Sequence, residues 1–454
     1  MHASKLKKIE RKGDKKNSPF FEEFLSRIYD RRESSGLHDL LGPMRAVLVQ
    51  VQTGDALSYL AELYLMTPYR FHAGYANKTH RIYILRNHPV IASEHSERGN
   101  PPTPHRNKIA SSASPSRNDT RAHTYLPDYI VLEPLSHSYR DRFSSLNSIY
   151  PKSEAKLNAK YMGEIYRVNN LNETQKILEG QQFRFLNIST INNHFLCHPS
   201  FAFTKISYYT GNIVGYTESD LKDYGALELG TPFTLDAEAR KTLEKADAVQ
   251  KHFGLHNLIH GIDHLATRVL ANEREDAILE FLSLSNYYFW GAYTIEDMNS
   301  STNICRNPDI KTELHSPAKV FTANNVPYYA NSIVGLPSPT EDFVRNYGKR
   351  MHHIAYEVED GATEDGTKYI DFLVDKLIAA DVHFLEQVIG ECRDFPDLKQ
   401  IFSKSSHYST LVTEYVQRCE GFDGFFTKSN VAYLTHAAGQ DEALNPVAPG
   451  PVHD

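Results

Sequence analysis

Hydrophobic and polar positions along the chain form a pattern of elements that occurs four times. The first copy starts with the β-rich stretch RAVLVQVQ at residue 45, and apolar residues three and four apart after TGD then predict a helix. Two alternating stretches follow, RFHAGYAN and RIYILRNHPVIA, which predict strands. The second copy starts near residue 163 with EIYRV, the helix NNLNETQKILEG, the strand QQFRFLNI and a hairpin that turns at Gly211-Asn212.

The third copy starts at residue 258 and the fourth at residue 350. Their first strands are LIHGIDHLATRV and RMHHIAYEVED, and their helices are EREDAILEFLSL and TKYIDFLVDKLIAA. The later strands are YYFWGAYTI, STNICRN, VHFLEQV, LKQIFSK and STLVTEYVQR. Four such copies amount to an internal repeat. We therefore predict an α+β fold of four βαβββ modules, paired into two cup-shaped mixed-sheet domains whose inward-facing side chains share a cavity.

The same pattern predicts the domain boundaries. Residues 97–122 are rich in Pro, Ser, Asn and Arg, and too poor in apolar residues to fold, which indicates an insertion in the first domain. The predicted parts are a disordered basic tail (1–40), an N-terminal double-module domain (41–235), a connector (236–256), a C-terminal double-module domain (257–440) and a second tail (441–454).

Composition narrows the classes of partner. The chain has 454 residues with 49 Lys+Arg against 56 Asp+Glu, so its net charge of -7 gives no general attraction to nucleic acid or anionic membranes. No apolar run approaches the roughly 18 residues of a membrane span, and we expect a cytoplasmic protein. The cysteines are far apart and form no CxxC pair, which argues against a disulfide framework and indicates a reducing compartment; they are Cys197, Cys305, Cys392 and Cys419.

The sequence holds 22 histidines, of which two stand on predicted strands of the last two copies with apolar neighbours on both sides. These are His264 and His353, and Glu414 has a similar setting. A carboxylate is costly to bury there unless it is paired or bound to a cation. Two imidazoles and one carboxylate form the facial triad of non-haem Fe(II) sites, with three open positions. Each residue could instead be an ordinary strand residue, and His260 and His352 compete as ligands. Because His352 and His353 have opposite parity in their strand, only one of them can face a cavity.

The last two copies also resemble a known family in their amino-acid sequence. The motifs are IDHL at Ile262–Leu265, HHIAY at His352–Tyr356, KQIF at Lys399–Phe402, EYVQR at Glu414–Arg418 and GFDGFF at Gly421–Phe426, followed by Asn430. Together they resemble the C-terminal half of the 4-hydroxyphenylpyruvate dioxygenases, in the vicinal oxygen chelate superfamily. The resemblance implies the vicinal oxygen chelate fold with a metal-free N-terminal half.

The same resemblance implies roles for single residues. It implies Fe(II) as the cofactor and selects His353 over His352, with the metal held by His264, His353 and Glu414. It further implies catalytic roles for Gln400 and Gln417, and a substrate pocket that includes Phe402, Phe422, Phe425 and Asn430. Since the side chain of Asp263 should alternate away from that of His264, we expect Asp263 at the surface.

The function implied is oxidative decarboxylation and hydroxylation of a 2-oxo acid with O2. The expected substrate is 4-hydroxyphenylpyruvate or a related aryl-pyruvate, with a homogentisate-type product, and a homo-oligomer is left open. The family's Pro-rich loop before the KQIF strand is missing, so the resemblance supports iron chemistry better than a particular substrate. One alternative is an extradiol ring-cleaving dioxygenase, which needs an additional acid/base histidine such as His383 or His407. The other is a metal-free binding or scaffold protein with the same fold.

Overall fold

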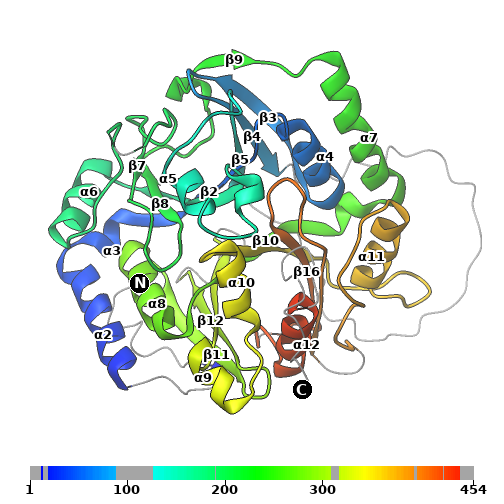
Figure 1. Ribbon diagram of the computed structural model, residues 1–454. Helices are drawn as coiled ribbons and strands as arrows, with labels where there is room; N and C mark the ends of the chain where they lie inside the picture. The colour runs from blue at the N-terminus through cyan, green and yellow to red at the C-terminus, as the bar shows by residue number, and fades with distance from the viewer. Residues whose placement is uncertain are drawn as a thin grey trace, which may run out of the picture.

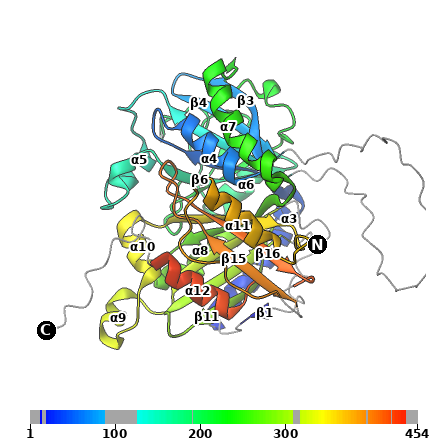
Figure 2. The same cartoon turned by 90° about the vertical axis from the view of Figure 1, so that its right-hand side faces the viewer.

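The strands of the protein form two mixed sheets of eight strands, one from each half of the chain. The computed structural model describes residues 12–13, 19–87, 126–189, 191–307, 316–392, 396–422 and 424–439. In Figure 1 the N-terminal half runs from blue to green and the C-terminal half from green to red. Figure 2 shows the N-terminal sheet stacked above the C-terminal one. The predicted insertion (97–122) and the tail (441–454) lie outside the described residues.

The N-terminal sheet has the strand order β7-β8-β6-β2-β5-β4-β3-β9. Its two modules meet where the first strand of each, β2 and β6, pair in antiparallel fashion. The elements are β2 (Leu41–Gln50), α4 (Ala56–Met66), β3 (Tyr69–Ala76), β4 (His80–Asn87), β5 (Asp128–Pro134), α5 (Arg142–Asn147), β6 (Lys160–Val168), α6 (Leu171–Gly180), β7 (Ala202–Phe203), β8 (Ile213–Thr217) and β9 (Thr231–Phe233).

The C-terminal sheet has the order β1-β11-β12-β13-β10-β14-β16-β15 and follows the helix α7 (Ala237–Phe253) of the connector. Its module-opening strands β10 and β14 again pair antiparallel at the centre. The elements are β10 (Ile259–Arg268), α8 (Arg274–Leu284), β11 (Tyr288–Ile295), β12 (Ser300–Arg306), β13 (Ala318–Asn324), α9 (Tyr328–Val334), α10 (Pro339–Tyr347), β14 (Arg350–Val358), α11 (Tyr369–Ala379), β15 (Asp397–Phe402), β16 (Val412–Cys419) and α12 (Lys428–Gly439). None of the helices described is long and apolar enough to cross a bilayer.

The prediction of a disordered tail up to residue 40 is wrong from residue 19 onward. This segment forms α2 (Pro19–Ser34) and α3 (Leu37–Leu40), and the short β1 (Lys12–Gly13) pairs with β11. The side chains of Phe21 and Leu25 are fully buried, and the Arg32 guanidinium donates to three backbone carbonyls between residues 282 and 287 at 2.6 to 3.1 Å. The basic residues before this helix obscured its apolar face, which packs on the C-terminal domain.

Some strands also differ from the prediction. QQFRFLNI and VHFLEQV form isolated bridges and not strands, at Phe185 and Phe384. In contrast, β5 and β13 were not predicted, although each completes its module by pairing in parallel with the module's first strand. Both follow long polar segments that hid their place in the repeat.

The expectation that the cysteines form no disulfide framework needs one correction. Cys392 and Cys419 are joined by a disulfide, although 27 residues separate them. The antiparallel pairing of β15 with β16 places Asp397 opposite Cys419, and the backbone N–H of Cys392 donates to the Asp397 carboxylate at 3.2 Å. Sequence separation alone therefore did not show that these two residues are neighbours.

The two domains share a buried interface. A single hydrophobic core cluster includes residues of both sheets. The hydroxyl of Tyr415 on β16 donates to the carbonyl of Met66 at the end of α4 at 2.6 Å. On the other side, the hydroxyl of Tyr216 on β8 donates to the carbonyl of Leu284 in α8 at 2.6 Å. These bonds tie each sheet to a helix of the other domain.

Candidate metal centre

Strand register brings His264, His353 and Glu414 to one point in the C-terminal cup. Antiparallel pairing of β10 with β14 places Ala266 opposite His353, and parallel pairing of β14 with β16 places Ala355 opposite Glu414. The Glu414 Oε2 atom lies 3.0 Å from His264 Nε2 and 3.2 Å from His353 Nε2, and the two nitrogens are 3.3 Å apart. All three residues are buried. This group is the one set of three or more His, Cys, Asp or Glu, in the described part of the chain, that could hold a metal ion.

The spacing fits three ligands on adjacent positions of one ion. Ligand atoms about 2.1 Å from a metal and at right angles to one another lie roughly 3 Å apart, which is the spacing found here. Two neutral nitrogens and one carboxylate are also the donor set of open Fe(II) sites. The residues present therefore fit such an ion.

Charge is unevenly distributed over the three groups. Burial lowers the pKa of His264, but the carboxylates of Glu414 and Asp263 outweigh this effect and raise that pKa to about 9. Burial and the neighbouring His264 hold the pKa of His353 well below its usual value. The cluster thus favours one positive charge close to the Glu414 carboxylate. A bound metal cation would supply such a charge at the same place.

Asp263 is not at the surface, contrary to the expectation from strand alternation. Register shifts on both sides of Ile262 interrupt the alternation of β10. The Asp263 side chain consequently turns back, and its Oδ1 atom lies 2.7 Å from His264 Nδ1. The guanidinium of Arg418 in turn pairs with both oxygens of Asp263, and this charge keeps the pKa of Asp263 low although burial opposes it. Asp263 and Arg418 together fix the ring orientation of His264.

His353 has a different partner behind it. His353 Nδ1 lies 2.8 Å from Nδ1 of His352, whose ring is buried against Phe343 and Phe402. With opposite parity in β14, His352 cannot share the cavity with His353, but it can orient that ring. The remaining candidates do not reach the cluster: His260 pairs with Glu359, and His383 and His407 are exposed.

Gln400 contacts the cluster directly. Its Nε2 donates to Glu414 Oε1 at 2.6 Å, while its Oε1 accepts from Asn430 Nδ2 at 3.2 Å. Asn430 also donates to the carbonyl of Leu398 at 2.8 Å. Asn430, which was predicted to bind substrate, is therefore in contact with Gln400 and the β15 backbone.

The predicted catalytic role of Gln417 is not supported by its position. Its Oε1 accepts from the backbone N–H of Ile370 at 2.9 Å and its Nε2 donates to the carbonyl of Gly361 at 2.8 Å. Three residues beyond Glu414 on the same strand, Gln417 faces the opposite side of the sheet. It anchors α11 to the sheet and does not face the cluster.

Aromatic rings surround the three groups. The ring of Phe402 lies 4.8 Å from that of His353, and the rings of Phe425 and Phe426 lie 5.9 and 5.1 Å from that of His264, between centroids. Phe426 was not predicted, although it adjoins Phe425 in the GFDGFF motif. Phe422, in contrast, packs over Gly424 in the loop, where an added Cβ would lie 2.6 Å from its ring.

Phe425 has a backbone conformation that side chains other than glycine rarely adopt. Its φ is +64°, which lies in the left-handed region. The hydroxyl of Tyr293 donates to the carbonyl of the preceding Gly424, and the ring of Trp290 lies 5.7 Å from that of Phe425. These contacts hold the loop over the cluster in spite of the backbone strain.

The N-terminal sheet repeats this register without the ligands. Its equivalent pairings place Ala46, Gly163 and Gly215 where the C-terminal sheet has its three candidate ligands. Phe203 pairs with Gly215 as Phe402 pairs with Glu414, and its ring lies 2.4 Å from the position of a Cβ added to Gly215. None of the three side chains at these positions can bind a metal.

Comparisons with known proteins address the fold. Neither protein-family models nor curated proteins give a match to the sequence. Among solved structures, a mutant 4-hydroxymandelate synthase from Streptomyces coelicolor is similar over 88% of this chain and 99% of that chain, with 13% identity and a TM-score of 0.53. The chain has the vicinal oxygen chelate fold. A xylose isomerase-like TIM barrel/4-hydroxyphenylpyruvate dioxygenase fusion protein is similar over 91% of this chain and 57% of that chain, with 13% identity and a TM-score of 0.51.

These similarities confirm the predicted architecture. The vicinal oxygen chelate fold is built from βαβββ modules paired about two central antiparallel strands, as β2 pairs with β6 and β10 with β14 here. In fold, the chain is thus similar to both of these solved structures, as its C-terminal motifs predicted. At 13% identity the likeness concerns the arrangement of the chain.

Proposed function

We propose that the protein is a non-haem Fe(II)-dependent dioxygenase that acts on a 2-oxo acid, in particular 4-hydroxyphenylpyruvate or a related aryl-pyruvate. The convergence of His264, His353 and Glu414 at the spacing of three adjacent metal ligands carries this proposal. Such a set leaves half of an octahedral ion open for substrate and O2. The names of the two similar structures support the substrate class, because one is a 4-hydroxymandelate synthase and the other contains a 4-hydroxyphenylpyruvate dioxygenase.

His264, His353 and Glu414 would hold the ion. Bound Fe(II) supplies the activation of O2 that oxidative decarboxylation of the 2-oxo acid and hydroxylation of the remainder require, with a homogentisate-type product. Gln400 occupies Oε1 of Glu414, so that Oε2 stays directed at the two imidazoles. Asp263 and His352 orient the two rings from behind, each through the Nδ1 atom.

The aromatic residues have two roles in this proposal. Phe402, Phe425 and Phe426 present apolar surfaces beside the ligands, which suit the ring of an aryl-pyruvate. They also exclude water, which protects reactive species from hydrolysis and strengthens the electrostatic contacts inside. Gln400 and Asn430 are uncharged, so they hold Glu414 without adding a charge that would compete with the ion.

Oxygen consumption tests the proposal. The protein is purified without oxygen, loaded with Fe(II) and mixed with 4-hydroxyphenylpyruvate, phenylpyruvate or a catechol. We expect O2 uptake with the aryl-pyruvates, one CO2 released per O2 consumed, and no uptake in Glu414→Gln. Uptake with the catechol alone would establish the extradiol alternative, although both histidines considered for its acid/base step are exposed. If neither metal binding nor uptake were found, the protein would be a scaffold.

A further inference from the structure

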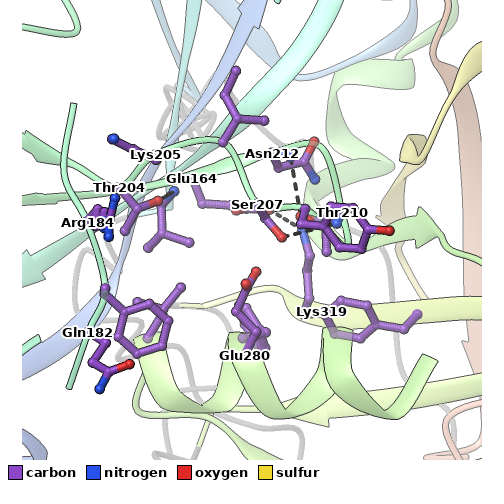
Figure 3. A pocket seen from close by; sticks show the side chains of 17 residues that line it. Glu164, Gln182, Arg184, Thr204, Lys205, Ser207, Thr210, Asn212, Glu280 and Lys319 are labelled. Carbon is purple, nitrogen blue, oxygen red and sulfur yellow. Dashed lines mark hydrogen bonds and ion pairs between the residues drawn. The ribbon is translucent and has the colours of Figure 1, made fainter. Parts of the chain in front are cut away.

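A cavity lies between the two domains. It has a volume of about 160 Å³, and its walls come from β6, the segment after α6, the hairpin between β7 and β8, the helix α8 and the strand β13. Figure 3 shows these side chains around the open space. His264, His353 and Glu414 are not among the lining residues, so this cavity is separate from the candidate metal centre.

Three basic and two acidic side chains line the cavity, namely Arg184, Lys205 and Lys319 against Glu164 and Glu280. Glu164 and Lys319 form an ion pair across the domain interface, both of them buried, and Glu164 also accepts from the hydroxyl of Tyr161 at 2.8 Å. The side chain of Glu280 extends from α8, and its carboxylate points into the space (Figure 3). Lys349, the cation that acts on Glu280 from outside the cavity, is itself bonded to Glu273 at 2.6 Å.

The surroundings of Glu280 indicate which kind of ligand group would compensate the negative charge of its carboxylate. Burial raises the pKa of Glu280, while the Ser207 hydroxyl opposes that shift, so a second donor at this carboxylate would stabilise its charged form. Arg184 and Lys205 lie on the other side of the space (Figure 3), and Arg184 is exposed. The place beside Glu280 therefore suits a group that brings a positive charge and hydrogen-bond donors.

The rest of the wall is apolar and aromatic. Phe183, Phe281 and Phe321 line the cavity together with Val214 and Leu284. Aromatic faces attract cations and bury carbon chains. Asn212, which also lines the cavity, is 4% exposed, and neither polar atom of its side chain has a hydrogen-bond partner among the described residues. A buried amide without a partner is costly, and a polar ligand or ordered water would satisfy it.

Size limits the ligand further. A cavity of about 160 Å³ is smaller than the roughly 300 Å³ or more of sites for drug-sized ligands, yet much larger than the roughly 10–15 Å³ of accessible volume that holds a single water molecule. A small metabolite fits this range.

We propose that this interdomain cavity binds a small molecule with a primary ammonium group. The ammonium pairs with Glu280 beside the Ser207 hydroxyl, and the carbon skeleton lies against Phe183, Phe281 and Phe321. The same chemistry could come from a simple amine or from the amino end of a free amino acid. Since Lys319 is opposite Leu265 in the pairing of β13 with β10, the wall of this cavity adjoins the strand that carries His264.

Calorimetric titration of the full-length protein tests this site. The probes are phenethylamine, phenylalanine and 3-phenylpropanoate, which share a skeleton and differ in their charged groups. We expect the amine to bind and the carboxylate to fail. Binding of phenylalanine as well would point to an amino acid, and its failure would point to a simple amine; both results agree with the proposal, provided that the amine binds.

Two variants locate the binding. Glu280→Gln should weaken the amine at least about tenfold, because a hydrogen bond to a charged group is lost. Glu244→Gln makes the same change at an exposed position of α7 that does not line the cavity, and should leave the affinity unchanged. The proposal is overturned if the amine does not bind the wild-type protein, if 3-phenylpropanoate binds equally well, or if Glu280→Gln binds the amine as the wild type does. Amine binding that survives Glu280→Gln but disappears in His264→Ala would place it at the metal centre instead.

Discussion

Replacing Glu414 by Gln is the sharpest test of the candidate metal centre, because it removes one charge and almost no volume. In the folded protein, Glu414 is 1% exposed and contacts Gln400 through Oε1 and both imidazoles through Oε2. The amide of the variant can still accept from Gln400 through its oxygen, and its NH2 group can donate to the histidine nitrogens. The fold should therefore survive, while the site loses its anionic ligand.

The expected loss of Fe(II) affinity can be bounded. Groups that merely orient a metal ligand change affinity by about 10- to 100-fold. Removing an anionic ligand must exceed that range, so we expect at least roughly 1,000-fold weaker Fe(II) binding, or about 4 kcal/mol. The change in folding stability should be much smaller, because the loss of a charge-assisted bond of about 1.5–3 kcal/mol is offset by the absence of a buried charge.

Anaerobic Fe(II) titration and thermal unfolding measure the two effects separately. Glu420→Gln is the control, since this exposed residue directly follows β16. We expect the control to bind Fe(II) like the wild type and Glu414→Gln to bind none at micromolar concentration. The melting temperature of the metal-free Glu414→Gln protein should stay within about 6 °C of the wild type, from roughly 2–4 °C per kcal/mol in a chain of this size. Glu414→Gln protein that retained Fe(II) affinity within tenfold of the wild type would refute the ligand assignment.

Three further predictions concern other parts of the molecule. His352→Leu should weaken Fe(II) binding about 10- to 100-fold by freeing the ring of His353, and His352→Gln should restore part of the loss; equal affinities in titrations of all three proteins would contradict the positioning role. Replacing Cys392 and Cys419 by Ser opens a bridge across 27 residues, so denaturant unfolding should show a loss of up to about 3.5 kcal/mol; unchanged stability would argue that the bridge does not form. Burial raises the pKa of Glu62 from 4.5 to about 7, so the folded state binds this proton more tightly than the unfolded state. Stability should fall by roughly 1–2 kcal/mol as the pH rises from 4.5 to 7, after allowance for screening at this half-buried site, and stay level above that pH. Urea unfolding of Glu62→Gln should show a smaller decrease, and the same slope in both proteins would exclude Glu62 as its source.

Strand periodicity predicted the repeat, whereas the three candidate ligands were selected by the family resemblance of their motifs. On β14 and β16, the residues that face the cavity follow one another at every second position, so that His353 and Glu414 could be chosen by parity and motif. Asp263 shows where this rule fails. The irregular register of β10 turns the Asp263 side chain back toward His264. The pattern of apolar residues does not reveal such a bulge.

Long-range contacts were beyond the reach of the sequence for a different reason. Gln417 lies in a motif with Glu414, yet its partners Gly361 and Ile370 are on a distant loop and helix. The bond between Asp263 and Arg418 likewise joins two strands that are far apart in the chain. Spacing along the chain says little about such partners, whereas sheet register determines them. The helix α2 was missed because its stability comes from contacts with residues near 285 and not from its own composition.

The glycines of the N-terminal sheet make the difference between the two cups hard to reverse. A Cβ on Gly163 would lie 1.9 Å from the carbonyl oxygen of Ile213, and one on Gly215 would collide with the ring of Phe203. Single substitutions to His or Glu would therefore disrupt the sheet before they could create a ligand. A point mutation is enough to remove a metal ligand from a cup, whereas a ligand can be placed in the N-terminal cup only if the neighbouring strands are rebuilt as well.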